Sequence, residues 1–414
     1  MNDVTGDEVP NPGPRGSTWP DSQASNHEVV PRRGPFLSLL TSPARGAIAV
    51  LRVWGEGAVE AADRVFRPHR GVRLAESSAR RPRVGRVGRG TGDEVVALIL
   101  KDNSRLDEVE FQCHGGPAAV AMVVEALEQV GVCQRSADDW VRVQQSSLVR
   151  ALAHHDLAHA ETDRVARHLL AQAQGALDEA LDAIRSRLSD DPSEAIERLN
   201  MLIDRAEVGC HLVSGWRVAL AGRPNVGKSR LLNALAGYGR AIVSSTPGTT
   251  RDVVTARIAI DGWPVEVADT AGLRVTQDPI EAGGVSLARS RHGGADLVLL
   301  ILDQSEPFTE TDRGLIKDYE NALIVCNKRD LVAVWEPDAS WGEVKRISAE
   351  RGDGLESLVA TISRRLVPDP PQAGEAIPFR EPQRQHLIEV RRLLQAGCLE
   401  QARTTLDQLQ AGAS

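Results

Sequence analysis

The sequence predicts a multidomain protein of the α/β plus α class, in which a doubly wound, mostly parallel sheet domain is inserted in a helical domain and follows a small mixed α/β domain. The chain has 414 residues, more than one hydrophobic core usually supports. Over residues 215–371, short apolar runs alternate with helix-length segments, as in a parallel sheet covered on both faces. Over residues 134–214 and 372–414, apolar residues recur every three or four positions, which predicts helices.

Composition and charge narrow the class of protein. Hydrophobic residues make up 42% of the chain, charged residues make up 26%, and no apolar run approaches the ~18 residues that span a bilayer, so we expect no membrane segment. The five cysteines are scattered without CxxC spacing, which argues against a disulfide scaffold or a zinc cluster and favours a cytoplasmic location. The net charge of -8 argues against indiscriminate binding to polyanions, so any nucleic-acid contact must be local.

The N-terminal part of the chain divides into a leader and a small domain. Residues 1–35 are polar and rich in proline, without the basic start and short apolar segment of a secretory signal, so we expect a disordered leader. Residues 36–133 form the mixed α/β domain. Apolar runs at 46–53 and 94–100 predict strands in it, and helical spacing at 118–130 predicts a helix.

An arginine-rich stretch separates the two predicted strands, and Phe66 is its only aromatic residue. A solvated loop or sheet edge is the favoured interpretation, and a contact surface for RNA or phosphate is the alternative. The arginines are Arg64, Arg67, Arg70, Arg73, Arg80, Arg81, Arg83, Arg86 and Arg89.

The helical region carries a start signal and a histidine pair. Asp191 as a cap, Pro192 in the first turn and Glu194 three residues after the cap predict a helix that begins there. Its apolar stripes are expected to pack helices together. His155 and His159 stand four residues apart, but a metal site needs more ligands than this pair supplies, so a structural role is favoured.

The sequence GRPNVGKS at 222–229 fits the phosphate-loop pattern, between a predicted strand at 216–221 and a predicted helix at 230–236. Backbone N–H groups and the positive end of the helix surround phosphates in such a loop. Lys228 is expected to reach the terminal phosphates, and the hydroxyl of Ser229 is expected to bind Mg²⁺. The predicted nucleotide-binding residues here are Asn225, Val226, Gly227, Lys228, Ser229 and Arg230.

A second element, Asp269-Thr270-Ala271-Gly272, follows a predicted strand at 265–268. The Asp269 carboxylate can hold Mg²⁺ directly or through water, and Gly272 lets its backbone N–H approach a γ-phosphate. We count all four residues as nucleotide-binding.

Residues 240–252 lie between these two elements. A loop that closes over Mg²⁺ needs a hydroxyl on a mobile, glycine-bearing segment, and Thr249 and Thr250 are candidates. We predict Thr250 as the Mg²⁺ ligand.

Leu273, the residue after Asp269-Thr270-Ala271-Gly272, has no polar side chain that could position water. Ras-type proteins orient the attacking water with a glutamine at this point, whereas Leu273 occupies it here. Asp278 and Glu281 follow and offer carboxylates that could position water. Position alone does not choose between them.

A third element, NKRD, ends an apolar strand and identifies the base. Asp330 can accept both N–H donors of guanine, whereas adenine would leave this carboxylate facing an acceptor. Asn327 and the stem of Lys328 are expected beside the base. Ser348 and Ala349 are expected to close its far side, with the Ala349 N–H meeting the guanine oxygen. The alternative, a surface loop on an ATPase, does not account for the three elements in this order.

Together these elements resemble the TrmE-Era-EngA group of P-loop GTPases, and the wider chain is similar to the tRNA modification GTPases of the MnmE (TrmE) family. The similarity rests on residues 42–53, 114–117 and 150–161 and on the nucleotide module over 215–366. It implies that residues 36–133 form a folate-binding and dimerising domain. It also implies that a helical domain, residues 134–214 and 372–414, holds an inserted GTPase domain at 215–371.

The resemblance also implies an activity and partners. Family members hydrolyse GTP to GDP with Mg²⁺, and they use the phosphate-loop asparagine, here Asn225, to bind K⁺ when two GTPase domains of a homodimer meet. They position water through a glutamate that corresponds to Glu281. Their reaction modifies the wobble uridine (U34) of tRNA together with the flavoprotein MnmG, and a one-carbon tetrahydrofolate is an implied cofactor.

The chain also departs from this family. Members end in Phe-Cys-Ile-Gly-Lys, whereas residues 409–414 read LQAGAS, and Cys398 lies within a helical pattern. The folate region is altered around residues 150–160. A divergent paralogue without modification activity is therefore an alternative. The others are a ribosome-assembly GTPase, although no KH domain or second GTPase module is visible, and a GTP-regulated scaffold.

Overall fold

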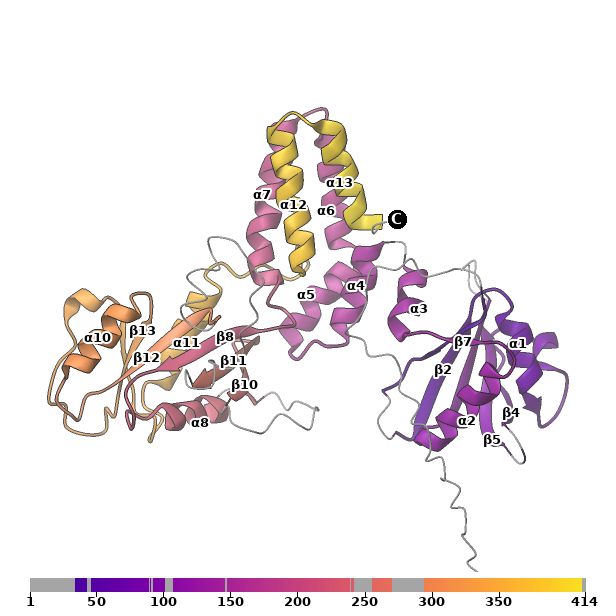
Figure 1. Cartoon of the computed structure of the whole chain (residues 1–414), viewed down its shortest axis with the longest axis horizontal. Helices are drawn as coiled ribbons and strands as arrows, with labels where there is room; N and C mark the ends of the chain where they lie inside the picture. The colour runs from indigo at the N-terminus through magenta and orange to yellow at the C-terminus, as the bar shows by residue number, and fades with distance from the viewer. Residues whose placement is uncertain are drawn as a thin grey trace, which may run out of the picture. The chain divides into compact units, whose positions relative to one another are not determined.

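The computed structural model describes residues 34–42, 46–88, 90, 92–100, 107–145, 147–238, 240–241, 255–269 and 294–411. All but the last two residues of the expected leader lie outside this part of the chain. The chain divides between Ala151 and Leu152 into two compact units, and each unit contains one seven-stranded sheet (Figure 1). The division falls within helix α4, Leu148–Leu157.

The sheet of the first unit has the order β3-β4-β5-β6-β2-β1-β7. It is antiparallel except for the pairing of β1 with β7. The strands expected at 46–53 and 94–100 and the helix expected at 118–130 are confirmed within two residues. The elements are β1 Phe36–Leu39, β2 Ile48–Trp54, α1 Ala58–Val65, β3 Arg67–Pro68, the 3₁₀ turn η1 Leu74–Glu76, β4 Arg83–Val87, β5 Asp93–Leu100, β6 Glu108–His114, α2 Pro117–Glu128, β7 Cys133–Gln134 and α3 Ala137–Gln144.

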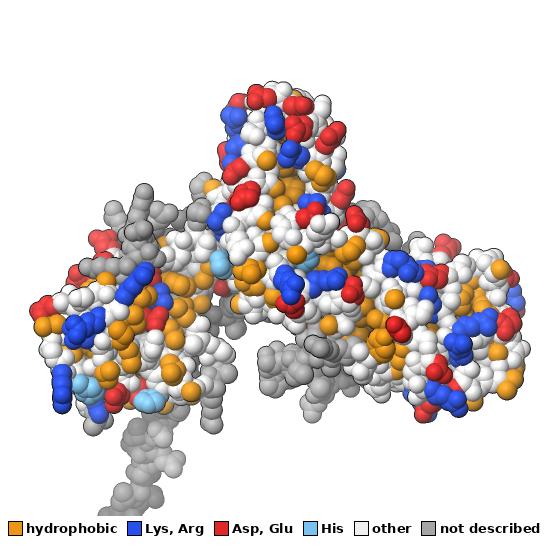
Figure 2. Space-filling model, turned by 180° about the vertical axis from the view of Figure 1, so that it is seen from behind, with side chains coloured by type: hydrophobic (Ala, Val, Ile, Leu, Met, Phe, Trp, Pro, Cys, Tyr) orange, Lys and Arg blue, Asp and Glu red, His pale blue; other side chains and the backbone are white. Residues whose placement is uncertain are grey.

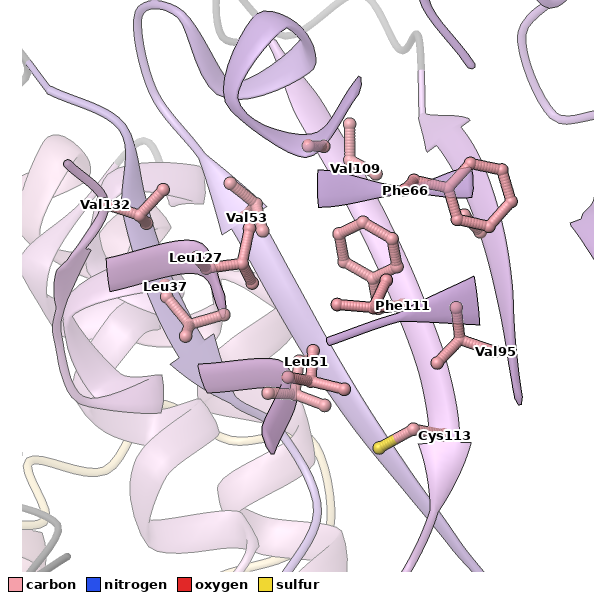
Figure 3. Close-up of a cluster of buried hydrophobic side chains, with 14 of the residues drawn as sticks. Leu37, Leu51, Val53, Phe66, Val95, Val109, Phe111, Cys113, Leu127 and Val132 are labelled. Atoms are coloured by element: carbon pink, nitrogen blue, oxygen red, sulfur yellow. The ribbon is translucent and has the colours of Figure 1, made fainter. Parts of the chain in front are cut away.

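One face of this sheet forms the core of the first unit. Side chains alternate along β5, so that Val95, Ala97 and Ile99 are buried while their neighbours are partly exposed. Val95 packs with Phe111 of β6 and Leu127 of α2 in a continuous apolar cluster (Figure 3). The opposite face of β5 carries Val96, Leu98 and Leu100, which are partly exposed.

Helix α3 packs against the sheet of the first unit, next to β1. Ser38 Oγ donates to the Ser136 carbonyl at 2.9 Å, immediately before α3. The guanidinium of Arg52 lies 4.7 Å from the centre of the Trp140 ring, and the same arginine pairs with Glu108 at 2.7 Å.

In the second unit, helices from both ends of the nucleotide module lie side by side. Helix α12 packs on α7 and α13 packs on α6, seen as yellow beside magenta in Figure 1. The predicted start of α7 is confirmed, because the Asp191 side chain accepts from the Glu194 N–H at 3.0 Å. The helices are α5 Asp163–Gln174, α6 Ala176–Arg187, α7 Pro192–Gly209, α12 Glu381–Gln395 and α13 Leu399–Ala411.

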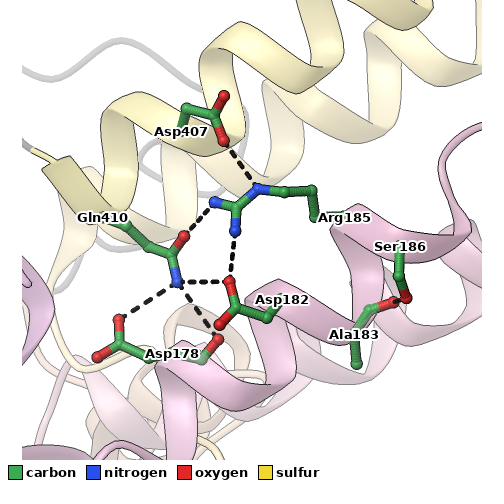
Figure 4. A network of polar contacts seen from close by, with 7 residues as sticks. All are labelled: Asp178, Asp182, Ala183, Arg185, Ser186, Asp407 and Gln410. Atoms are coloured by element: carbon green, nitrogen blue, oxygen red, sulfur yellow. Dashed lines mark hydrogen bonds and ion pairs between the residues drawn. The ribbon is translucent and has the colours of Figure 1, made fainter.

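Polar contacts fix the α6–α13 pair. Arg185 of α6 pairs with Asp407 at 2.8 Å and also contacts Gln410, both on α13 (Figure 4). Gln410 donates in turn to Asp182 at 3.2 Å and to the carbonyl of Asp178 at 3.3 Å. The last helix is therefore held by side chains about 220 residues earlier in the chain.

The segment before α12 is held at a buried amide. The side chain of Gln172 is fully buried, donates to the Glu375 carbonyl at 2.9 Å and accepts from the Ile377 N–H at 3.2 Å. Both polar atoms of this amide are thus satisfied, which removes the cost of burying it.

The second sheet has the order β14-β13-β12-β8-β11-β10-β9, parallel from β14 to β11. All seven residues of β12 are buried, as expected for a strand covered on both faces. The strands predicted at 216–221 and 265–268 and the helix predicted at 230–236 are confirmed within two residues, and the apolar strand expected before NKRD is β13. The elements are β8 Trp216–Ala221, α8 Lys228–Tyr238, β9 Arg240–Ala241, β10 Thr255–Ile260, β11 Trp263–Asp269, β12 Leu297–Asp303, α10 Glu310–Asp318, β13 Leu323–Asn327, the 3₁₀ turn η3 Ala339–Trp341, β14 Val344–Arg346 and α11 Leu355–Leu366.

Helix α5 contacts the turn between β10 and β11. Thr162 Oγ1 donates to the Gly262 carbonyl at 2.6 Å, and the guanidinium of Arg164 lies 4.9 Å from the centre of the Trp263 ring. The buried ring of His168 stacks on the same tryptophan at 5.7 Å. Burial, and then the charge of Arg164, hold the pKa of His168 below its ordinary value.

Across the described ranges, no helix combines the length and the apolar character needed to cross a bilayer.

Candidate functional site

The predicted phosphate loop joins β8 to α8, and its backbone requires glycine at two positions. Gly222 has φ +142°, and a Cβ there would lie 2.4 Å from the Ile301 carbonyl oxygen. Gly227 has φ +100°, and a Cβ there would lie 2.3 Å from Asn327 Nδ2. Asn225 between them has φ +67°, a left-handed conformation that asparagine tolerates. The loop therefore curls tightly ahead of the α8 N-terminus, the geometry suited to phosphate.

The polar side chains of the loop lie at the start of α8. Lys228 Nζ donates to the carbonyls of Gly222 and Arg223 at 3.0 Å each, so its ammonium is held over the loop. Ser229 is exposed in the first turn. Arg230 is exposed and pairs with Glu350 at 3.0 Å. The structure brings these residues to one end of the sheet, and their roles toward phosphate and metal stay predictions.

Asn327 joins three parts of the predicted site. Its side chain is 2% exposed; Nδ2 donates to the Val226 carbonyl at 2.9 Å, and Oδ1 accepts from the Ala349 N–H at 3.0 Å. The amide thus ties the phosphate loop to the Ser348–Ala349 segment. The Ala349 N–H that was expected to meet guanine contacts Asn327 here.

Asp330 contacts Ser348, the neighbour of Ala349. Its Oδ1 accepts from Ser348 Oγ at 2.6 Å, and Ser348 is itself buried. This hydrogen bond is the main cause that holds the pKa of Asp330 below its ordinary value, despite an opposing desolvation. The carboxylate is therefore ionised and acceptor-only at neutral pH, as recognition of two guanine N–H donors requires.

Asp303, the last residue of β12, was not predicted from the sequence. It is 2% exposed and pairs with Lys328 Nζ at 2.5 Å. Burial opposes its ionisation, but hydrogen bonds from Lys328 and Ser305 outweigh burial and lower its pKa. Lys328 has φ +64°, so the pair holds a lysine on an unusual backbone conformation beside the site. The feature that could have identified Asp303 in the sequence is its position at the carboxyl end of a parallel strand.

A second missed contact supports the phosphate loop. Arg223 Nε donates to Asp312 Oδ1 at 2.8 Å. Asp312 is 2% exposed and also completes the capping box at the start of α10 with Thr309. The loop is thus fixed from the side of α10 by a buried carboxylate.

Several predicted residues fall outside the described part of the chain. Asp269 ends β11, where its backbone is in register with Leu220 next to the phosphate loop. The predicted residues outside the described ranges are Thr249, Thr250, Thr270, Ala271, Gly272, Leu273, Asp278 and Glu281.

The two histidines lie at the end of α4, His155 within the helix and His159 just beyond it. The rings of His155 and His159 lie 4.8 Å apart. Among the described residues, no group of three His, Cys, Asp or Glu side chains is placed to hold a metal ion. The structural role of the pair stays a prediction.

Two family models match the chain. The model described as "50S ribosome-binding GTPase" matches residues 217–328, which contain the phosphate loop and end at Lys328. The model described as "GTP-binding protein TrmE N-terminus" matches residues 36–139 of the first unit.

Curated relatives match most of the chain. A tRNA modification GTPase MnmE of Symbiobacterium thermophilum is 34% identical over 371 residues, covering 79% of this chain and 81% of that protein. The same-named protein of Thermus thermophilus is 34% identical over 370 residues, covering 81% and 83%. Among solved structures, the G domain of the T. maritima FeoB iron transporter is 29% identical and covers 36% of this chain and 98% of its own, at a TM-score of 0.27, too low to support a structural argument.

Proposed function

We propose, from the premise that this chain belongs to the MnmE family of tRNA modification GTPases, that it couples GTP hydrolysis to modification of the wobble uridine (U34) of tRNA. The family membership makes it a GTP-binding enzyme that acts with Mg²⁺. The finer steps below, from potassium to partners, are our proposal.

The observation that carries the proposal is the Asn327 bridge. One buried amide contacts both the phosphate loop at Val226 and the base-side segment at Ala349, with the ionised Asp330 beside it. These contacts support a triphosphate site and a guanine site that lie next to each other at the end of the parallel strands. Lys228 and the backbone N–H groups of the loop then bind the phosphates.

The residues present suit the metals that the family implies. The Ser229 hydroxyl and the Asp269 and Thr250 side chains offer the oxygen donors that Mg²⁺ prefers, and the ion neutralises charge on the β- and γ-phosphates. Asn225 has an exposed amide on the loop, and its oxygen suits K⁺. We propose that Glu281 positions the attacking water.

The domain arrangement is part of the proposal. We propose that the GTPase domain, residues 215–371, is inserted in a helical domain. The packing of α12 on α7 and of α13 on α6 supports this. Residues 36–133 are proposed to dimerise and to bind a one-carbon tetrahydrofolate. The partners are a second copy of the chain, MnmG and tRNA, in the cytoplasm.

GTP hydrolysis measured in KCl and in NaCl tests the proposal. We expect faster turnover in KCl, and expect Asn225→Ala to lose this difference while Asn321→Ala, at an exposed position away from the loop, keeps it. Equal turnover in both salts would contradict the proposed role of K⁺, and no turnover in either salt would contradict the proposed GTP hydrolysis. Analysis of U34 in a deletion strain, with and without the gene restored, tests the tRNA role.

A further inference from the structure

One edge of the N-terminal sheet concentrates positive charge. Nine of the 26 residues from Arg64 to Arg89 are arginine, and Glu76 is the only acidic residue among them. The whole chain has a net charge of -8. The stretch is therefore strongly positive in a chain whose net charge is negative.

The fold gathers these arginines at one place. The stretch runs from the last turn of α1 through β3 and η1 to β4, and β3 and β4 are the outer two strands at one end of the sheet. Arg67 of β3 and Arg86 of β4 are direct cross-strand partners. Arg73 is tied back to Asp63 of α1 by an ion pair, which holds the connecting loop against the same edge.

Several of these guanidinium groups are available to a partner. Arg64, Arg70 and Arg81 are exposed, and they form no ion pair or side-chain hydrogen bond with any described residue. Figure 2 shows Lys and Arg side chains on the surface of the first unit.

Sheet structure alone does not account for this composition. Arg67 and Arg86 lie directly opposite each other, an arrangement of like charges that by itself destabilises a strand pair, although Arg86 is also opposite Glu94 of β5. Charged side chains on an edge strand resist edge-to-edge pairing, but only Arg67 lies on the edge strand β3, so this role does not account for the other arginines. A bound anion would instead turn the repulsion into attraction, and the guanidinium fork matches a phosphate with two parallel hydrogen bonds.

We infer that this edge, from Arg64 to Arg86, binds the sugar-phosphate backbone of RNA. Resting on the proposed function, we assign the RNA as tRNA. The guanidinium groups lie along a strand pair and its loop, which suits successive phosphates of a nucleic acid, whereas surface binding to lipid ordinarily uses an amphipathic helix. Backbone contacts position the RNA and read no sequence.

Anisotropy of a fluorescent tRNA transcript with unmodified U34, titrated with the full chain over a range of KCl, tests this inference. For Arg70→Gln with Arg81→Gln, loss of two phosphate contacts should lower the slope of log K against log salt by roughly 1.5 and weaken binding about 10-fold or more near 0.1 M salt. Arg365→Gln with Arg403→Gln removes the same charge from exposed positions in the second unit that form no ion pair with any described residue, and this variant should bind like the unsubstituted chain.

Arg70→Lys with Arg81→Lys keeps the positive charges and so distinguishes loss of charge from loss of folding. It should restore binding to within about 3-fold of the unsubstituted chain, because the phosphate attraction is kept. Equal affinity and salt slope for the two Gln double variants would overturn the inference, and so would no tRNA binding by the unsubstituted chain. Binding to phosphatidylglycerol vesicles that tRNA does not displace would assign the edge to a lipid surface instead.

The same preparation distinguishes this inference from the proposed function. GTP hydrolysis by the unsubstituted chain without RNA tests the activity alone. Arginine-dependent tRNA binding without hydrolysis would leave the RNA surface standing and remove the coupled function. Hydrolysis and U34 modification with no effect of the arginine variants on tRNA binding would remove only the surface.

Discussion

Replacing Asp303 by asparagine tests whether the buried carboxylate holds the guanine-side lysine. In the structure its oxygen lies 2.5 Å from Lys328 Nζ, and its other oxygen accepts from Ser305. Asparagine can keep the bond from Ser305, but it cannot keep the charge. Its amide would then present N–H donors to the ammonium of Lys328, so this side chain should turn toward solvent.

The size of the effect follows from the exposure of the two partners. The Asp303 side chain is 1% exposed and that of Lys328 is 26% exposed, so water can reach the ammonium once the pair is broken. A fully buried pair would cost about 3 to 5 kcal/mol. A charged hydrogen bond with one accessible partner costs roughly 2 kcal/mol. We expect a loss of about that size in unfolding free energy, and about 10-fold weaker GDP binding because the lysine stem leaves the base.

Titration of a fluorescent GDP analogue and urea unfolding at pH 7 measure these changes, with Asp369→Asn, an exposed carboxylate, as control. The pKa of Asp303 is lowered in the folded state, so its contribution is present at neutral pH and is lost as the pH falls below about 4, the ordinary pKa of aspartate. Stability and GDP affinity equal to those of the control would refute the reasoning.

Three further substitutions test guanine recognition, the positioning of the attacking water and the titration of the buried His168. Asp330→Asn should weaken GTP binding and let xanthine nucleotides compete better in the same titration; an unmoved GTP affinity would show the base assignment to be wrong. Glu281→Ala should leave GTP binding near that of the unsubstituted chain and lower kcat by ~10² or more, and unchanged turnover would remove its role. His168→Phe keeps the stack on Trp263 but cannot titrate. Because the pKa of His168 is lowered, the unfolded state binds more protons below about pH 6.5, so the unsubstituted chain should lose more stability than this variant between pH 7 and pH 5 in urea unfolding. An equal loss would place the acid sensitivity elsewhere.

The parallel strands were predictable because local chemistry fixes them. A strand covered on both faces must be apolar throughout, and β12 is buried along its whole length. The cap at Asp191 was equally visible, since its side chain and the following proline act within one turn.

Breaks in the helical stripes were not predictable from spacing. Gly175 separates α5 from α6 with φ +114°, and Gly397 lies between α12 and α13 with φ +74°. Glycine tolerates both helical and left-handed backbone, so the sequence does not show which it adopts. The strands β4 and β10, each next to the last strand of its sheet, were missed because arginines and small residues interrupt the apolar runs RVGRV and TARIAI.

Some residues of the site could likewise be predicted from the sequence, and others could not. Residues of the phosphate loop and the NKRD element lie in short contiguous motifs, so their spacing marked them. Asp303 contacts Lys328 at the end of the neighbouring strand, and Asp312 of α10 contacts Arg223 of the phosphate loop. Nothing in the local sequence of either carboxylate identifies its partner. The Asn327 bridge likewise joins residues about 100 positions apart.

Competition between nucleotides tests the central claim, a guanine-specific triphosphate site built on the Asn327 bridge, most directly. Purified chain with Mg²⁺ is loaded with a fluorescent GDP analogue and challenged with GTP or ATP. We expect GTP to displace the analogue and ATP to require a concentration about 10⁴-fold higher, because adenine leaves the Asp330 carboxylate unpaired. Displacement by ATP and GTP at similar concentrations would contradict the account.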